Sequence, residues 1–245
     1  MRRSLCNTLR IFLALAVALS FLAGTNKPVQ AETCTWEGVT SIDWTNPANW
    51  TCGVPGSSHD AIIPIGTPYQ PTIPATTGVT VNTITINSGA TLTILKGSVV
   101  NAATWTINGA LIANAADSPI SLNSQPWPGG GVMNVSSTGS ITKLGLEDLF
   151  IYAELNNAGS VIFTEHGSGY GGVALIRGGA HTGKFEGEYL FVGNNDEVSG
   201  QIFNFNDGSD LRINQVHARG GTVNILGTFS PPENFGTYLF VQPTS

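Results

Sequence analysis

The chain has 245 residues, of which 41% are hydrophobic and only 11% are charged. The hydrophobic fraction argues against disorder, and the scarcity of Glu, Lys and Arg argues against long helices, whose solvated faces are usually built from those residues. Four of the ten basic residues but none of the 16 acidic residues precede Glu32, which leaves a formal net charge of −10 after residue 31. This charge argues against a nucleic-acid partner.

Residues 1–31 have the pattern of a secretory signal peptide. Three arginines lie among the first ten residues, and residues 11–23 form an apolar run of 13 residues, which is too short to span a bilayer. Small residues at Val29 and Ala31 predict cleavage before Glu32. We expect a secreted protein, extracellular or at the cell surface, with no transmembrane segment after cleavage. An uncleaved anchor is the alternative, which the short apolar run disfavours.

After removal of residues 1–31, Cys34 and Cys52 are the remaining cysteines. Two neighbouring thiols in an oxidising compartment tend to pair, so we expect one disulfide, which would stabilise the fold by about 3 kcal/mol through loop closure. A zinc site is the alternative, but it requires more ligands, and His59 is the nearest histidine. No metal, cofactor or catalytic residue is expected elsewhere.

Residues 32–77 differ in composition from the rest of the chain and predict an N-terminal cap. They hold Trp36, Trp44 and Trp50, both cysteines and six prolines, a density that excludes long helices and central strands. Such a segment can cover the open end of a repetitive β-structure. The alternative is that the three indoles form an exposed platform on which sugar rings stack.

Residues 78–245 contain repeated strand patterns. Residues 83–92 alternate apolar and polar side chains, and residues 104–111 repeat the pattern 21 positions later. The triplets at 149–151, 190–192 and 239–241 share the form Leu-Phe-Val or Leu-Phe-Ile, the first two being 41 residues apart. A recurrence near 41 that divides into two units near 20 is the size of turns in a β-solenoid.

A solenoid would stack Ile86 over Ile107 in a continuous dry column, with Thr and Asn facing water. The alternative folds are a jelly roll or an immunoglobulin-like sandwich, which also consist of short strands but do not predict the matched spacing. The triplet at 239–241 ends close to the last residue and predicts an edge through which copies of the chain could self-associate.

Several segments resemble the N-terminal region of bacterial secreted and cell-surface β-helix repeat proteins. The resemblance covers about 60 residues and is carried by Thr35–Gly38, Ser41–Trp44, Ala48–Trp50, Gly53–Gly56, Asp60–Pro64 and Ile84–Leu92. It implies an all-β protein with a right-handed parallel β-helix of the pectin-lyase-like or adhesin-like kind. With the composition of residues 32–77, the expected fold is such a helix behind a Trp/Pro-rich, disulfide-stapled cap.

The sequence offers few candidates for catalysis. Glu186 and Glu188 share one face of a predicted strand with Lys184, and Arg177 precedes them. A polysaccharide lyase or glycoside hydrolase would need such carboxylates and a base to converge, so this enzyme class is our alternative. Short charged alternation is more typical of a solvated strand face. We therefore expect a structural or interaction module, adhesin-like or matrix-like, in contact with extracellular polysaccharide or cell-surface components.

Threonines suggest a third, minor function. Thr83 and Thr85 should stack under Thr104 and Thr106 on one outward face, and ordered threonine ladders can bind ice or crystalline surfaces. The pattern spans only two repeats, and outward threonine is ordinary in β-strands.

Overall fold

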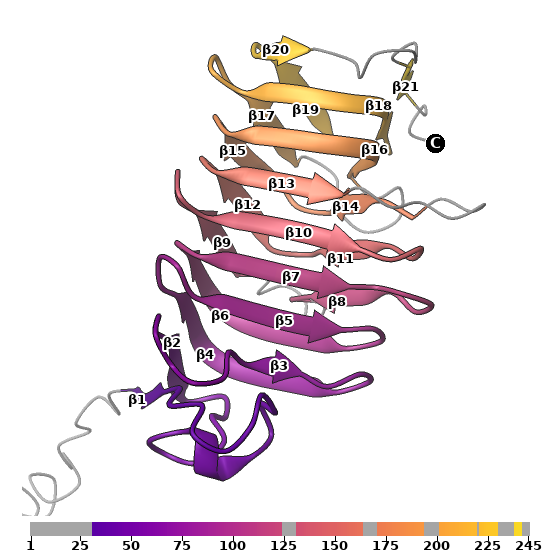
Figure 1. Cartoon of the computed structure of the whole chain (residues 1–245). Coiled ribbons are helices and arrows are strands. Elements are labelled where there is room, and N and C mark those ends of the chain that lie inside the picture. Colours follow the sequence, from indigo (N-terminus) through magenta and orange to yellow (C-terminus); the bar gives the residue numbers. More distant parts are fainter. Residues whose placement is uncertain are drawn as a thin grey trace, which may run out of the picture. The chain divides into compact units, whose positions relative to one another are not determined.

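The alternation of apolar and polar residues produces short parallel strands that coil around one axis (Figure 1). The computed structural model describes residues 31–123, 131–163, 171–193, 201–219 and 221–229, together with the backbone of 238–241. The predicted signal peptide lies outside the described residues, apart from Ala31. Within these ranges the one helical element is the 3-10 turn η1 (Pro47–Asn49), and no helix is long and apolar enough to cross a membrane.

The strands of the unit Glu32–Ser245 form three parallel ladders, which we call sheets 1, 2 and 3. Sheet 1 contains β1 (Glu32–Thr35), β2 (His59–Ile63), the C-terminal halves of β4 (Gly78–Ile86) and β6 (Val99–Ile107), β9 (Val132–Val135), β12 (Glu154–Asn157), β15 (Gly179–His181), β17 (Ile202–Phe205) and β19 (Thr222–Ile225).

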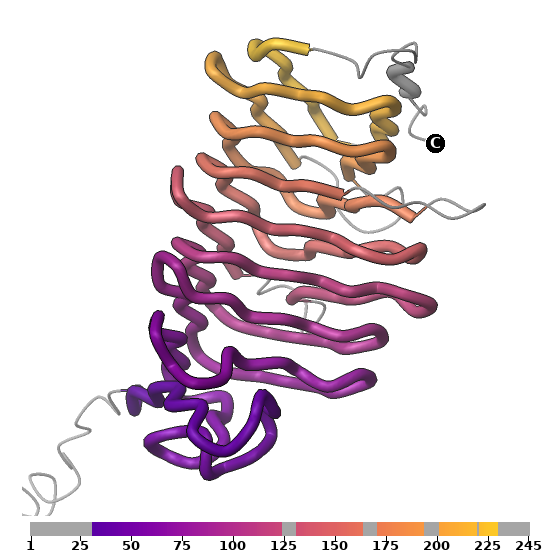
Figure 2. Tube along the Cα trace, viewed as in Figure 1, coloured from indigo at the N-terminus to yellow at the C-terminus, as the bar shows by residue number. Residues whose placement is uncertain are grey.

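Sheets 2 and 3 complete each turn of the chain, which we call a rung (Figure 2). Sheet 2 contains β3 (Thr72–Ile73), β5 (Thr91–Leu95), β7 (Ala110–Asn114), β10 (Ser140–Leu144), β13 (Ser160–Phe163), the N-terminal halves of β16 (Lys184–Val192) and β18 (Asp210–Ala218), and β20 (Thr228–Phe229). Sheet 3 contains the remaining halves of β4, β6, β16 and β18, with β8 (Ile120–Leu122), β11 (Leu149–Ile151), β14 (Val173–Leu175) and β21 (Tyr238–Val241).

The predicted parallel β-solenoid is confirmed, and the sandwich alternative is wrong. Every ladder between named strands in the described ranges is parallel, and Ile86 pairs with Ile107 as predicted. Leu149 aligns with Val173 and then with Leu190 on sheet 3, so the recurrence of 41 residues is two rungs. The repeated triplets therefore mark alternate rungs of one sheet.

The core is a set of in-register columns of inward side chains. One column on sheet 1 runs through Ile63, Ile86, Ile107, Val135, Asn157, His181 and Phe205. Each of these residues is at most 2% exposed. Since each rung has one layer of inward residues, burial of that layer depends on the rungs before and after it.

The first rung is covered by three tryptophans. Trp36 and Trp44 are fully buried, and each packs edge-on against Trp50 with ring centroids 5.0 and 4.6 Å apart. The Trp36 indole N–H donates to the carbonyl of Tyr69, and that of Trp50 to the carbonyl of Trp44. The burial of these rings removes the exposed platform for sugar rings that was the alternative.

Parallel stacking begins earlier than the sequence indicates. Strands β1 and β2 lie inside residues 32–77, the segment predicted as the cap, yet they already form the first two strands of sheet 1. The prolines of this segment obscure the alternation, because they lie in the long turns between β1, β2 and β3.

Cys34 and Cys52 form the predicted disulfide, with Cα atoms 5.3 Å apart. Cys34 is fully buried and is the first member of an inward column, over Ala61. The ligand atoms of His59 and both cysteines lie within 4.8 Å of one another, so the zinc alternative had the right neighbours. Zinc binds thiolates, however, and both sulfurs are joined to each other here.

Glycines form a second stack at the corner between sheets 1 and 2. Gly109, Gly139, Gly159 and Gly183 occupy equivalent positions in four rungs, and a Cβ atom on any of them would lie 2.0 to 2.3 Å from a carbonyl oxygen of the preceding rung. The amide N–H of the residue after each glycine donates to the preceding rung, which keeps the corners close. Any side chain there would push two rungs apart.

Replacing both Cys34 and Cys52 by alanine should lower the free energy of unfolding by about 3 kcal/mol, because the unfolded chain regains the entropy of the loop that the disulfide closes. Urea unfolding of the variant and of the parent chain, with and without reductant, measures this difference. Reductant should destabilise the parent but not the variant. Equal stability of the two proteins would contradict the role of the disulfide.

Gly159→Ala should destabilise the fold by about 1 to 3 kcal/mol, because the new Cβ would overlap the carbonyl oxygen of Gly139, 2.1 Å away. The matched control is Gly78→Ala, where nothing lies within 4 Å of the added atom and the φ angle is ordinary. The control should change stability by no more than about 0.5 kcal/mol. Thermal unfolding of both variants tests the pair, and an equal loss in both would be inconsistent with close stacking.

Candidate functional site

The three sheets present outer walls of different chemistry. On sheet 2, Lys184 forms an ion pair with Glu186, and Arg212 pairs with Asp210 at 2.9 Å on the next strand. The register places Lys184 beside Asp210 and Glu186 beside Arg212, so opposite charges are neighbours in both directions. This part of the wall is a neutralised, solvated strand face.

The residues of the predicted enzyme alternative do not gather into one site. Lys184, Glu186 and Glu188 all lie on β16, with Glu188 at the bend between its two halves. Arg177 lies between β14 and β15, at the corner that joins sheets 3 and 1 and is remote from sheet 2. Since the Glu186 carboxylate is bound to Lys184, these residues do not form a pair of carboxylates across a cleft.

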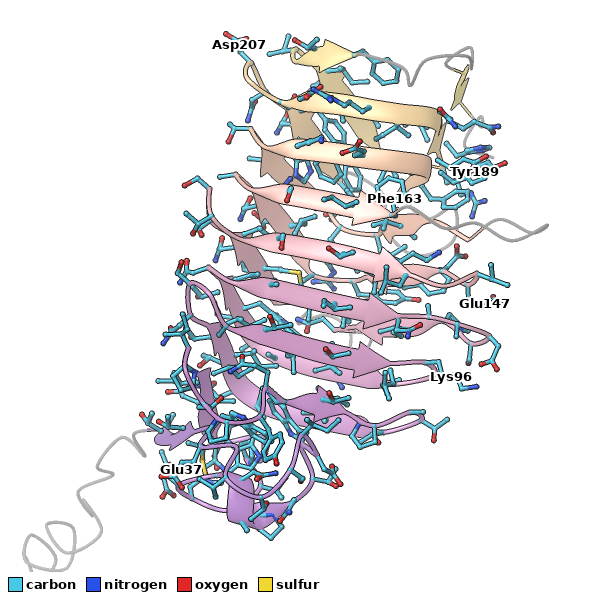
Figure 3. The ribbon with its side chains drawn as sticks, in the orientation of Figure 1. Glu37, Lys96, Glu147, Phe163, Tyr189 and Asp207 are labelled. Atoms are coloured by element: carbon cyan, nitrogen blue, oxygen red, sulfur yellow. A yellow bond between two sulfur atoms is a disulfide. The ribbon has the colours of Figure 1, made fainter. Side chains whose placement is uncertain are left out.

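Other charged residues lie at the corners of the rungs. Figure 3 shows Lys96 and Glu147 at the corner between sheets 2 and 3, and Asp207 at the corner between sheets 1 and 2. Lys96 contacts Asp117 in the same row of corners at 2.5 Å. Like-charged side chains are thereby kept off the flat, closely spaced strands.

The predicted threonine ladder is present but short. Thr83 pairs in register with Thr104, and Thr85 with Thr106, on the outward face of sheet 1. The Thr83 hydroxyl donates to Asp60 at 2.8 Å, and Asn134 follows Thr106 in the next rung. The ladder therefore spans two strands, and an asparagine surface replaces it.

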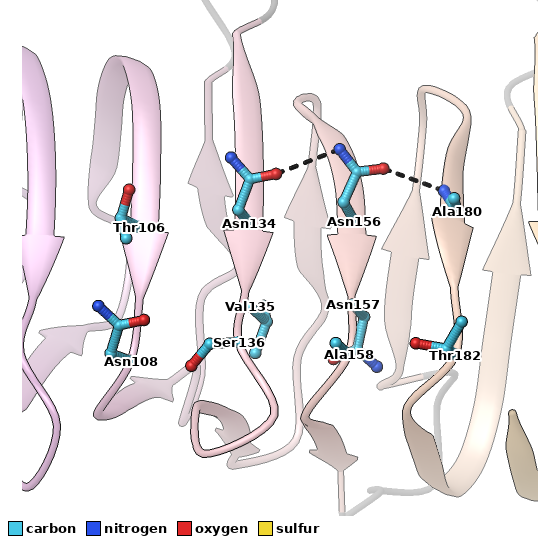
Figure 4. Close-up of a pocket in the computed structure, with 10 residues that line it drawn as sticks. All are labelled: Thr106, Asn108, Asn134, Val135, Ser136, Asn156, Asn157, Ala158, Ala180 and Thr182. Atoms are coloured by element: carbon cyan, nitrogen blue, oxygen red, sulfur yellow. Dashed lines mark hydrogen bonds between the residues drawn. The ribbon is translucent and has the colours of Figure 1, made fainter. Parts of the chain in front are cut away.

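This asparagine surface contains an open groove of about 400 Å³ (Figure 4). Its lining comes from the ends of four successive strands of sheet 1 and from the corners after them. The lining residues are Thr106, Asn108, Asn134, Val135, Ser136, Asn156, Asn157, Ala158, Ala180 and Thr182. We call this feature the asparagine groove.

The hollow results from small residues among larger polar ones. Two outward rows cross the rungs, and each contains an alanine: Ala180 in the row of Asn134 and Asn156, and Ala158 in the row of the corner residues. Both alanines are exposed. The neighbouring amides and hydroxyls form the rim, so the floor is apolar and the rim is polar.

Side-chain amides connect three rungs across the groove. The Asn156 amide donates from Nδ2 to Oδ1 of Asn134 at 3.3 Å, and its Oδ1 accepts from the backbone N–H of Ala180 at 3.1 Å (Figure 4). Among the described residues, the Nδ2 group of Asn134 and the amide of Asn108 make no side-chain hydrogen bond. These groups can donate and accept toward a molecule in the groove.

The groove contains no ionisable side chain, because its ten lining residues are all neutral at any pH. Its recognition chemistry is therefore that of amides, hydroxyls and small apolar surfaces. Sequence reasoning missed this site. The signal was available as the asparagines at 134 and 156, but the loop at residues 124–130 displaces the spacing from 21 to 28 residues and hides their alignment.

A buried histidine lies directly behind the groove. His181 lies between Ala180 and Thr182 but points inward, where it is fully buried between Phe185 and Phe205 with ring centroids 5.1 and 4.7 Å away. Neither ring nitrogen has a hydrogen-bond partner. Burial lowers the pKa of His181 to about 4, so the ring is neutral at pH 7.

The wall of sheet 3 is aromatic in its later rungs. Phe191, between the two inward residues of its triplet, points outward yet is only 2% exposed, and it packs with Ala174 and Ile176. The Arg219 guanidinium lies 4.2 Å from the centre of the Phe191 ring. Burial and Arg219 together lower the pKa of His217 on the same wall. The burial of Phe191 indicates a packed surface and not an open platform.

Comparison with known proteins yields one match. A family model described as "Domain of unknown function (DUF8693)" matches residues 35–140. No curated protein and no solved structure matches the chain. The matched segment includes the disulfide, the tryptophans and part of the asparagine groove. The resemblance to bacterial β-helix repeat proteins stays a prediction.

His181 should make the fold acid-sensitive. Its pKa is about 4 in the folded state and about 6.5 when unfolded, so the unfolded chain binds more protons between these values. Stability from this residue is complete above pH 7 and falls as the pH decreases to 4. His181→Leu should gain about 2 to 3 kcal/mol relative to the parent between pH 7.5 and pH 4.5.

Urea unfolding of the parent chain and of His181→Leu at both pH values measures this gain. The carboxylates contribute equally to both proteins, so the difference between them isolates the histidine. A difference in stability that does not change with pH would show that His181 does not titrate as its burial requires.

Proposed function

We propose that this protein is a secreted binding module that holds a neutral polysaccharide chain in the asparagine groove. The observation that carries the proposal is a groove lined by amides and hydroxyls, without charge, that crosses successive rungs of a rigid parallel sheet. The role is that of an adhesin-like or matrix-like contact with extracellular glycan.

The chemistry of the groove suits sugars. A sugar hydroxyl both donates and accepts, and so does each of the amides of Asn108, Asn134 and Asn156. The exposed methyl groups of Ala158 and Ala180 can pack against the apolar C–H faces of a sugar ring. An acidic or basic ligand would find no counter-charge among the lining residues.

The repetition of the groove favours a polymer over a single sugar. Neighbouring parallel strands lie about 4.8 Å apart, so polar groups recur at that spacing along the solenoid axis. A polysaccharide lying along the axis would meet similar groups in each rung, and several weak contacts would add up to useful affinity.

The Cys34–Cys52 disulfide supports a location outside the cytoplasm, since such bonds persist in oxidising compartments. It agrees with the predicted signal peptide. The enzyme alternative has less support, because Glu186 and Lys184 pair with each other on a wall that the groove does not include.

The purified protein should bind one or more neutral polysaccharides on a glycan array without cleaving them. Ala158→Leu, which fills the exposed floor of the groove, should weaken binding at least tenfold. Asn134→Ala should weaken it about 3- to 10-fold, the value of one neutral hydrogen bond. The control is Thr142→Ala on the outward face of β10 in sheet 2, which should bind as the parent does.

Calorimetric titration with the bound polysaccharide measures the affinities, and thermal unfolding verifies that each variant is folded. Absence of binding across the array, or equal binding by Ala158→Leu, would contradict the proposal. Depolymerisation of a bound polysaccharide would support the enzyme alternative in its place.

A further inference from the structure

The end of the solenoid at β19 and β20 leaves its core uncovered (Figure 1). Ile225 follows Phe205 in the inward column of sheet 1, but it is 36% exposed where Phe205 is 1% exposed. The adjacent Leu226 is 72% exposed. The last inward residues of this sheet therefore lack the next layer that buries every earlier member of the column.

The same strand presents unpaired backbone groups. The N–H of Thr222 donates to Gln201 and that of Leu226 to Phe205, at 2.8 and 2.7 Å, so these residues direct their backbone toward β17. Because direction alternates along a strand, the N–H and C=O groups of Val223 and Ile225 point to the opposite edge. No strand of the described ranges pairs with that edge.

The other end of the solenoid is closed. The Thr35 N–H donates to the hydroxyl of Thr51, and the Thr51 N–H donates to the Thr35 carbonyl, which covers the edge of β1. The buried indoles of Trp36, Trp44 and Trp50 cover the core there. The molecule thus has one closed end and one open end.

We propose that two copies of this chain join through their open ends, with β19 of each paired antiparallel about a two-fold axis at Asn224. In this arrangement Val223 faces the partner's Ile225, so both outward pairs of backbone groups bond across the edge. Inward residues stay inward on both sides, and the two cores become continuous. Asn224 lies against the partner's Asn224 on the outer wall.

Three observations select a second copy as the occupant. Residues 221–229 contain no charged side chain, so two identical ends meet without repulsion. Asn224 already extends an amide ladder by donating to Asn204 at 2.8 Å, and an identical amide can continue that ladder. The closed end cannot accept an open end, so the assembly stops at two copies instead of forming a filament.

A cysteine at the two-fold position tests the geometry. Residues directly opposite at a non-hydrogen-bonded position of an antiparallel pair have Cα atoms about 4.5 Å apart, within the range that a disulfide spans. Asn224→Cys should therefore give a covalent dimer under mild oxidation. Thr222→Cys is the matched control, since the pairing places it opposite the partner's Leu226 and away from the partner's Thr222, so it should stay uncrosslinked.

Light scattering of the parent protein should show a concentration-dependent dimer. Ile225→Pro removes an N–H that points only to the open edge, so it should leave the ladder to β17 intact and prevent the dimer. Leu226→Lys should raise the dimer dissociation constant at least tenfold. Ile65→Lys, at a 64% exposed residue before the first full rungs, should leave it unchanged.

Unchanged thermal unfolding would show that the variants are folded. A monomeric parent at all concentrations, growth of filaments, or equal crosslinking of Asn224→Cys and Thr222→Cys would each overturn the proposal. Because glycan binding is measured separately on the groove, failure of the dimer leaves the proposed function unaffected.

Discussion

The structure depends on one constraint: a rung cannot bury its own inward side chains, so each rung is covered only by its neighbours. The inward column from Ile63 to Phe205 stays dry because the rungs lie in register. The same constraint makes the two ends special. One end uses three indoles and a disulfide as a cover, while the other ends in the exposed Ile225.

Because the inward positions hold the rungs together, the outward positions are free to differ between sheets. Sheet 2 pairs its charges, sheet 3 packs aromatic rings, and sheet 1 changes from threonine to asparagine along its length. A functional surface on such a scaffold needs only a few outward substitutions. The asparagine groove is an example, since two alanines among amides are enough to hollow the wall.

Polar residues inside the core show how far this tolerance extends. Asn157 donates to the carbonyl of Lys184 and accepts from the N–H of Gly159, so it secures a corner from within. Lys143 is fully buried and donates from Nζ to the carbonyl of Gly145 at 2.6 Å. His181 lacks such partners and stays neutral instead. Each case meets the cost of burial by a different route.

The sequence by itself determined the fold class, the disulfide and the division of the recurrence into two rungs, because alternation and spacing are properties of the chain alone. Only the tertiary structure decided which rungs align across loops of unequal length, and hence that Asn134 and Asn156 meet beside Ala180. It also decided that His181 points inward and that Ile225 is uncovered, since burial depends on neighbours distant in sequence. Local patterns cannot specify such neighbours.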